Sequence, residues 1–161
     1  MLYYPPQLEL KSDSVIAAET LIRWEHPTHG FLSPAEFIPL AEETGLIKDL
    51  TFWVIRQAFE QIAEWQSQNF DVKLSINLSA KDLETPDALS DFLAYQLEQT
   101  GISPALIELE LTESMLMDDP EKSKKELLAL KDMGFVLAID DFGTGYSSLN
   151  YLKNLPVDIL K

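Results

Sequence analysis

Helical and β-rich segments alternate along this chain from residue 34 onward, and this order limits the folds that it can form. Recurring apolar side chains and capping residues predict four helices, at residues 34–44, 48–68, 86–101 and 120–133. Runs rich in β-formers predict six strands, at residues 3–10, 15–24, 72–79, 106–112, 136–141 and 157–161. Such an order favours βα units around a mainly parallel sheet, either a barrel or an open doubly wound sheet.

Alternating side chains give the central strands one apolar face and one polar face, because neighbouring residues of a strand point to opposite sides. In residues 72–79 the polar set includes Asn77, and in residues 106–113 it includes Glu110. A parallel strand that helices cover on both sides should be apolar on both faces. The polar set therefore indicates the lumen of a barrel, where catalytic groups gather at the carboxyl ends of the strands.

The same parity places further polar residues on this face, namely Glu19, Arg23, Asp140 and Lys161. Several carboxylates at one mouth would repel one another, and a divalent cation would compensate for that repulsion. An antiparallel strand with one solvated face would show the same alternation, and that reading stays open for any single strand. The pattern in several strands and the βα connectivity argue against it.

Composition narrows the class of protein. The 161 residues are 46% hydrophobic and contain no Cys, which suits one domain in a reducing compartment. No apolar run is long enough to span a bilayer and no signal peptide is evident, so a cytoplasmic location is expected. The formal net charge of -15 argues against binding to a nucleic-acid polymer. A phosphorylated substrate is compatible with this charge if some of the carboxylates hold a divalent metal ion.

Four motifs in order carry a resemblance to a known family: AETLIRWEHPTHGFLSPAEFIPLAEETGLI at 18–47, SINLSAKDL at 75–83, ELELTES at 108–114 and DDFGTGYSSLNYLKNLPVDILK at 140–161. With them the chain resembles the EAL-domain family of cyclic di-GMP phosphodiesterases over nearly all of its length. The resemblance implies an α/β fold, a TIM-type (β/α) barrel whose first strand runs antiparallel to the rest. It also implies hydrolysis of one phosphodiester bond of cyclic di-GMP to the linear dinucleotide with Mg²⁺ or Mn²⁺.

Carried over position by position, the resemblance implies metal ligands, catalytic residues and substrate contacts. The metal ligands would be Glu19, Asn77, Glu110 and Asp140, with Asp141 for a second metal. Lys161 would assist the attacking water and steady phosphate charge, and Glu113 would hold the DDFGTGYSS loop in shape. Leu21 and Arg23 would contact the substrate. All the proposed ligands are oxygen donors, which suits hard cations better than zinc.

The length sets an expectation about how much of the domain is present. A (β/α)₈ barrel typically takes about 250 residues, so residues 1–161 are expected to form an EAL-type domain truncated after about its sixth strand. We expect such a fragment to be weak or inactive alone. The family further implies a homodimer, with contacts near the DDFGTGYSS loop, and fusion to sensory or regulatory domains. The alternative is a non-catalytic receptor or protein-interaction module with a degenerate barrel.

Overall fold

The computed structural model of the chain describes residues 1–11, 13–85, 87–113, 115–141 and 155–161, with residues 117 and 118 described in their backbone only. Its strands are β1 (Leu2–Tyr3), β2 (Pro6–Glu9), β3 (Ser14–Glu19), β4 (Leu21–Ile22), β5 (Trp24–His26), β6 (Gly30–Leu32), β7 (Lys73–Asn77), β8 (Ile107–Thr112), β9 (Val136–Asp140) and β10 (Ile159–Leu160). Its helices are α1 (Pro34–Thr44), α2 (Ile47–Ser67), α3 (Ala88–Thr100), α4 (Met115–Asp118) and α5 (Pro120–Asp132), with 3₁₀ turns η1 (Ala80–Leu83) and η2 (Pro104–Leu106).

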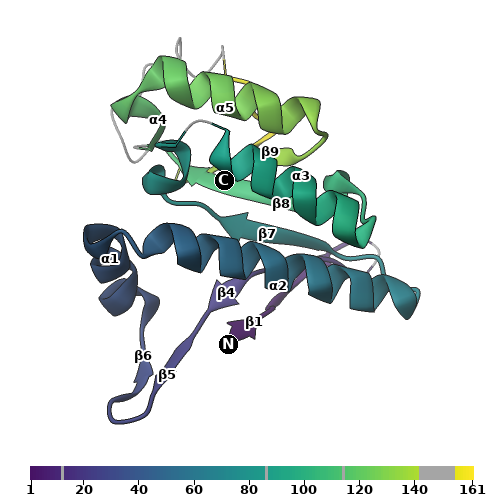
Figure 1. Cartoon of the computed structure of the whole chain (residues 1–161). Helices are drawn as coiled ribbons and strands as arrows, with labels where there is room; N and C mark the ends of the chain where they lie inside the picture. The colour runs from purple at the N-terminus through teal and green to yellow at the C-terminus, as the bar shows by residue number, and fades with distance from the viewer. Residues whose placement is uncertain (12, 86, 114, 142–154) are drawn as a thin grey trace.

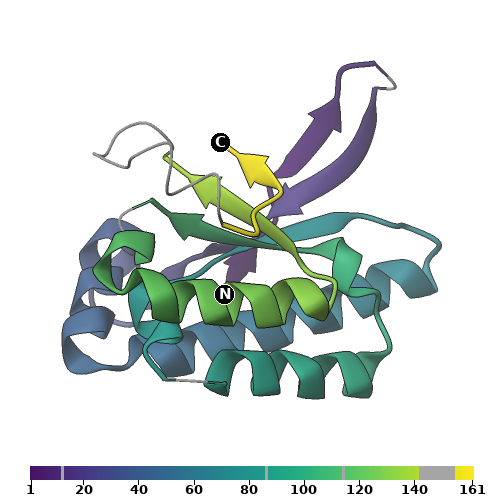
Figure 2. The same ribbon diagram turned by 90° about the horizontal axis from the view of Figure 1, so that it is seen from above.

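One sheet organises the molecule, with strand order β10-β9-β8-β7-β3-β2. Strands β3, β7, β8, β9 and β10 are parallel, whereas β2 pairs with β3 antiparallel. The sheet curls, and helices α2, α3 and α5 cover one of its faces (Figures 1 and 2). The predicted fold is confirmed: the chain forms part of a TIM-type barrel whose first strand runs against the others.

The core lies between the sheet and these helices. Alternate residues of β7 and β8 point into it, and Leu74, Ile76, Ile107 and Leu109 are each fully buried. Helix α2 presents its own apolar face to them through Ile55, Ala58, Phe59 and Ile62. The predicted apolar face of the central strands is thus the helix-facing side of the sheet, which leaves Asn77 and Glu110 on the opposite side.

Helix α5 shows how local sequence sets the ends of an element. The Asp119 side chain accepts a hydrogen bond from the Lys122 amide at the start of the helix, and Pro120 occupies its first turn. Gly134 follows the helix with a φ of +95°, which a residue with a Cβ rarely adopts. This turn sends the chain directly into β9.

The first two predicted strands were wrong in their bounds. Residues 3–10 divide into β1 and β2 around Pro5, because proline donates no ladder hydrogen bond, and the register of β2 on β3 shifts between Gln7 and Leu8. Residues 15–24 divide into β3, β4 and the start of a small hairpin, β5–β6, which the sequence patterns did not predict. The remaining strands and helices lie close to their predicted positions.

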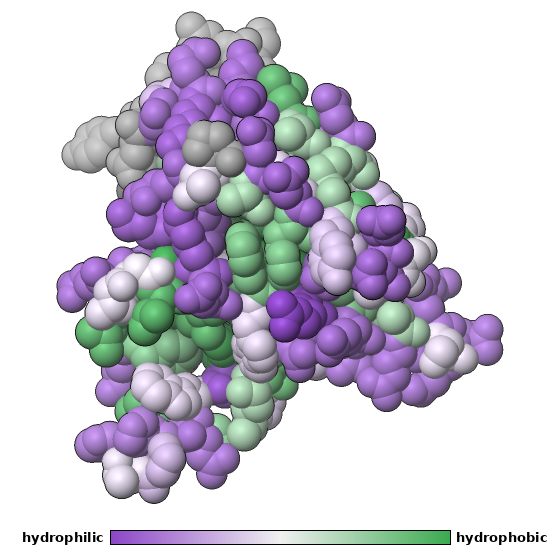
Figure 3. All heavy atoms as spheres, viewed as in Figure 1, coloured by the Kyte–Doolittle hydropathy of each residue, from purple (hydrophilic) through white to green (hydrophobic). Residues whose placement is uncertain are grey.

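The surface in the view of Figure 1 is mostly polar, with apolar side chains gathered over α1 and the adjoining start of α2 (Figure 3). Leu40 of α1 and Leu46, which directly precedes α2, are each more than half exposed. Among the helices that the structure describes, none is long and apolar enough to cross a membrane. The greater part of the DDFGTGYSS loop, including Gly143 and Gly145, lies outside the described residues.

Candidate active site at the carboxyl ends of the strands

The polar residues selected from the sequence lie along one edge of the sheet. Glu19, Asn77 and Asp140 are the last residues of β3, β7 and β9. Asn77 is the register partner of Glu110 on β8, and Lys161 directly follows β10. Because these strands are parallel, their carboxyl ends meet at the same edge, and the predicted residues come together there from five strands.

Side-chain contacts connect neighbouring strands at this edge. The Asn77 Nδ2 donates to Glu19 Oε1 at 3.1 Å, which joins β7 to β3. The Lys161 Nζ lies 2.7 Å from Glu108 Oε1 and donates to Glu110 Oε1 as well. Glu110 is only 3% exposed, so its carboxylate depends on this ammonium for compensation of its charge.

The pair of glutamates also determines the protonation of Lys161. Partial burial disfavours the ammonium, but hydrogen bonds and charge attraction from Glu108 and Glu110 raise the pKa of Lys161 above its ordinary value. The side chain therefore carries a positive charge at neutral pH. In this state it donates hydrogen bonds to the carboxylate oxygens and cannot accept one.

The remaining predicted residues lie next to this edge. The Asp141 amide donates to Asp140 Oδ1 at 2.9 Å, and Asp141 adopts a left-handed φ of +56° where the chain leaves β9. Glu113 directly follows β8 and its side chain is buried. In the described ranges, no three acidic or histidine side chains are gathered closely enough to hold a metal ion.

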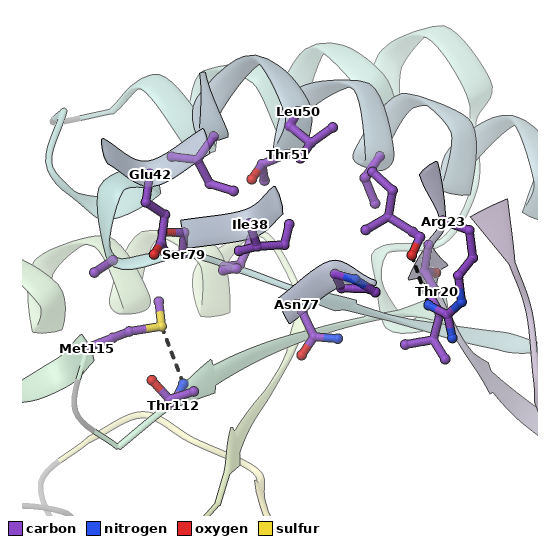
Figure 4. A pocket seen from close by; sticks show the side chains of 17 residues that line it. Thr20, Arg23, Ile38, Glu42, Leu50, Thr51, Asn77, Ser79, Thr112 and Met115 are labelled. Atoms are coloured by element: carbon purple, nitrogen blue, oxygen red, sulfur yellow. Dashed lines mark hydrogen bonds between the residues drawn. The ribbon is translucent and has the colours of Figure 1, made fainter. Parts of the chain in front are cut away.

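A cavity of about 480 Å³ opens beside these residues, between the strand ends and the helices α1 and α2 (Figure 4). Both predicted substrate contacts, Leu21 and Arg23, line it together with Asn77. Its helical wall is largely apolar and includes Ile38 and Leu50. The Arg23 Nη1 donates to the carbonyl of Ile22 at 2.8 Å. The cavity thus offers an apolar wall, a guanidinium and an amide to one ligand.

A buried polar network supports the far wall of this cavity and was not selected from the sequence. The Asp82 Oδ2 accepts hydrogen bonds from the Ser79 amide at 2.8 Å and from Thr51 Oγ1 at 2.9 Å. The Ser79 hydroxyl donates to Glu42 Oε1 at 2.6 Å. These bonds connect η1, α2 and α1. The Ser-x-x-Asp spacing of 79–82 is a capping box, and that pattern could have identified the network.

The chemistry of the edge fits a hard divalent cation. Glu19, Asn77, Glu110 and Asp140 offer carboxylate and amide oxygens, the donors that Mg²⁺ and Mn²⁺ prefer. Thiolates are absent from the sequence, and the two histidines belong to the β5–β6 hairpin and its turn. The Lys161 ammonium supplies the positive charge beside Glu110 in this structure. The donor set therefore suits magnesium or manganese better than zinc.

Comparison with known proteins gives consistent matches. The sequence profile of a family described as EAL domain matches residues 1–161. The cyclic di-GMP phosphodiesterase PA2567 of Pseudomonas aeruginosa is 43% identical over 161 residues, which make up 99% of this chain and 27% of that protein. The signaling protein YkoW of Bacillus subtilis is 42% identical over 161 residues, which make up 100% of this chain and 20% of that protein. The chain spans about a quarter of the length of the curated relatives it matches.

Solved structures agree with the sequence matches. The structure of the PaMucR phosphodiesterase in a c-di-GMP complex superposes with a TM-score of 0.92 at 41% identity, covering 99% of this chain and 65% of that one. The FimX EAL domain of Pseudomonas aeruginosa bound to c-di-GMP superposes with a TM-score of 0.87 at 28% identity, covering 99% and 63%. The strand arrangement described above is therefore the one found in these proteins.

Proposed function

The chain belongs to the EAL-domain family, and on this premise we propose that it carries the active-site edge of an enzyme that hydrolyses one phosphodiester bond of cyclic di-GMP to the linear dinucleotide. The observation that carries the proposal is the gathering of Glu19, Asn77, Glu110 and Lys161 at the carboxyl ends of neighbouring parallel strands. That edge is where (β/α) barrels place their chemistry.

We propose that Glu19, Asn77, Glu110 and Asp140 hold divalent cations, with Asp141 for a second one. The cations, Mg²⁺ or Mn²⁺, would neutralise phosphate charge and lower the pKa of bound water. The chain's own contribution is mainly positioning. The ladder between β7 and β8 fixes Asn77 opposite Glu110, and the Asn77 amide holds Glu19 at 3.1 Å, so these groups are arranged before substrate arrives.

Lys161 is assigned to the phosphate and its attacking water. As a lysine, it would serve as a hydrogen-bond donor and a positive charge beside the reacting phosphate. In that position Lys161 would assist deprotonation of the attacking water and steady the developing phosphate charge. Glu113, buried directly after β8, keeps its proposed role in shaping the loop that follows β9.

The cavity is proposed to receive part of the nucleotide. Leu21 and the apolar wall of α1 and α2 suit a base, and Arg23 suits a phosphate oxygen, which guanidinium groups bind through paired hydrogen bonds. The substrate is an anion and the chain carries a formal charge of -15, so bound metal and Arg23 would together supply the attraction.

Further parts of the proposal concern the protein as a whole. The matched relatives are longer than this chain, and we propose that the 161 residues alone turn over little substrate, that the full-length protein carries sensory or regulatory domains, and that it forms a homodimer in the cytoplasm. Light scattering on the full-length protein would test the dimer. A monomer at all concentrations would contradict it.

The test of the activity is a nucleotide assay on the full-length protein with cyclic di-GMP and Mg²⁺ or Mn²⁺. We expect linear dinucleotide from the wild type and a loss of about 10²-fold or more from Glu19→Gln, which removes a charged ligand while keeping its size. Glu25→Gln, at an exposed position of β5, is the matched control and should keep wild-type activity. Equal rates from both variants would contradict the assignment of Glu19.

A further inference from the structure

We propose that Asp82 is a positioning residue for nucleotide binding, and that its buried carboxylate holds the wall of the cavity in a binding-competent geometry. This inference rests on the proposed function. Asp82 does not line the cavity and is not among the proposed ligands or catalytic groups. It acts through Ser79 and Thr51, which both line the cavity.

The contacts show how one side chain connects three elements. Asp82 lies in η1, and its Oδ2 accepts from the amide of Ser79, two residues beyond Asn77 at the end of β7. The same oxygen accepts from Thr51 Oγ1 in the first half of α2. Ser79 continues the connection to Glu42 on α1. The strand end that bears Asn77 is thus held against both helices that form the opposite wall of the cavity.

The electrostatics show that this carboxylate opposes stability. Asp82 is 3% exposed, and its Oδ1 has no hydrogen-bond partner among the described residues. Burial raises the pKa of Asp82 to about 6, although the bonds from Ser79 and Thr51 and the charge of Lys48 on α2 oppose this shift. The charge of Glu42 on α1 adds to it. A carboxyl group whose pKa is raised on folding makes the folded state less stable when it is ionised.

Hydrogen bonds to an ionised carboxylate are about twice as strong as those to a neutral group. The ionised carboxylate therefore fixes the Ser79 amide and Thr51 more firmly than a neutral group could. On protonation the bonds weaken and the wall can move. We expect nucleotide affinity to depend on the ionised form of Asp82, and stability to favour its neutral form.

The experiment compares wild type with Asp82→Asn in the full-length protein, across pH 5 to 8. At pH 8 we expect the variant to bind cyclic di-GMP about fivefold more weakly, with KM raised and kcat little changed. The ratio of the two dissociation constants should fall toward one below pH 6, because wild-type Asp82 is then protonated. Use of the ratio cancels the titration of the metal ligands, which both proteins share.

Denaturant unfolding provides the readout that separates positioning from structural support. At pH 8 the Asp82→Asn variant should be at least as stable as wild type, since the ionised buried group is gone, and the difference should shrink toward pH 5. A residue with a purely structural role would lose stability and affinity together. Thr51→Val, which removes one donor at constant size, should raise KM in the same direction.

The experiment distinguishes failure of the proposed function from failure of the inference about Asp82. Wild-type protein that fails to bind or hydrolyse cyclic di-GMP would overturn the proposed function, and this inference with it. Wild-type protein that binds, with a ratio that stays constant from pH 5 to 8 or an Asp82→Asn variant that is both unstable and weak in binding, would overturn the inference alone. Asp91→Asn, on the exposed side of α3, is the control for the substitution itself.

Discussion

Lys161, directly after β10, forms ion pairs with two glutamates of β8. Its ammonium lies between Glu108 and Glu110, and the pKa is raised by both carboxylates against the opposing effect of burial. A raised lysine pKa contributes stability that is fully present below the unfolded pKa and is lost as pH rises through the folded value. The ion pairs should therefore persist across the whole neutral range.

Lys161→Met is predicted to lower kcat by about 10²- to 10⁴-fold, the range typical for a group that stabilises a reacting proton or charge. KM should change less, because Lys161 does not line the cavity. Steady-state kinetics with cyclic di-GMP provide the measurement. Lys73→Met, at the exposed start of β7, is the matched control. Unchanged kcat in the Lys161 variant would exclude Lys161 from the reaction.

The sequence identified most residues of the edge but not their partners. Strand parity and family motifs selected Glu19, Asn77, Glu110 and Lys161, because parity determines the face to which a side chain points. Parity alone does not tell which neighbour a side chain contacts. The contact of Glu108 with Lys161 and the Asp82 network both depend on the packing of elements far apart in sequence. These contacts could be identified only from the structure.

At the scale of elements, β10 is a two-residue strand that needs other support. The Asp158 Oδ2 accepts from the Leu137 amide at 2.8 Å, and its carboxylate pairs with the Lys131 Nζ at 2.7 Å. Burial acts against ionisation, but these two contacts lower the pKa of Asp158 below its ordinary value. Asp158 thus fastens the start of β10 to β9 and α5, three residues before Lys161.

Asp158→Ala is predicted to reduce the free energy of unfolding by about 1–2 kcal/mol at pH 7, allowing for the partial exposure of the pair. A lowered aspartate pKa contributes stability above the unfolded pKa and loses it as pH falls through the folded value. The difference between variant and wild type should therefore shrink below about pH 4, as urea titrations would show. Asp132→Ala, exposed at the end of α5, is the control. A difference that is constant with pH would contradict this account.

Long periodic elements were predicted well and short ones were not. Helices α2 and α5 and strands β7 to β9 follow from apolar spacing and caps, since their own sequences determine their form. The hairpin β5–β6 and the division around Pro5 were missed, because strands of two or three residues take their shape from neighbours that the sequence pattern does not name. Of the proposed site residues, Asn77, Glu110 and Asp140 lie on these well-predicted strands, whereas Glu19 ends β3, whose predicted bounds were wrong.

At the scale of the whole molecule, the formal charge of -15 should repel the proposed substrate, which is an anion. Cations held by the edge residues would neutralise part of the negative charge and so reduce this repulsion. Nucleotide affinity should therefore fall when metal is withdrawn, and the loss should be larger at low ionic strength, where repulsion is least screened. Calorimetry with cyclic di-GMP at two salt concentrations, with and without chelator, would measure this dependence. Affinity that is equal in all four conditions would contradict it.

The most direct test of the account is the rate of linear-dinucleotide formation from cyclic di-GMP by the full-length protein, after chelation and during titration with Mg²⁺ or Mn²⁺. We predict no product in chelator, a rate that rises and saturates with added metal, and loss of that rate in Glu110→Gln. Absence of product at every metal concentration, with tight binding of the nucleotide in chelator, would contradict the account and favour a non-catalytic receptor.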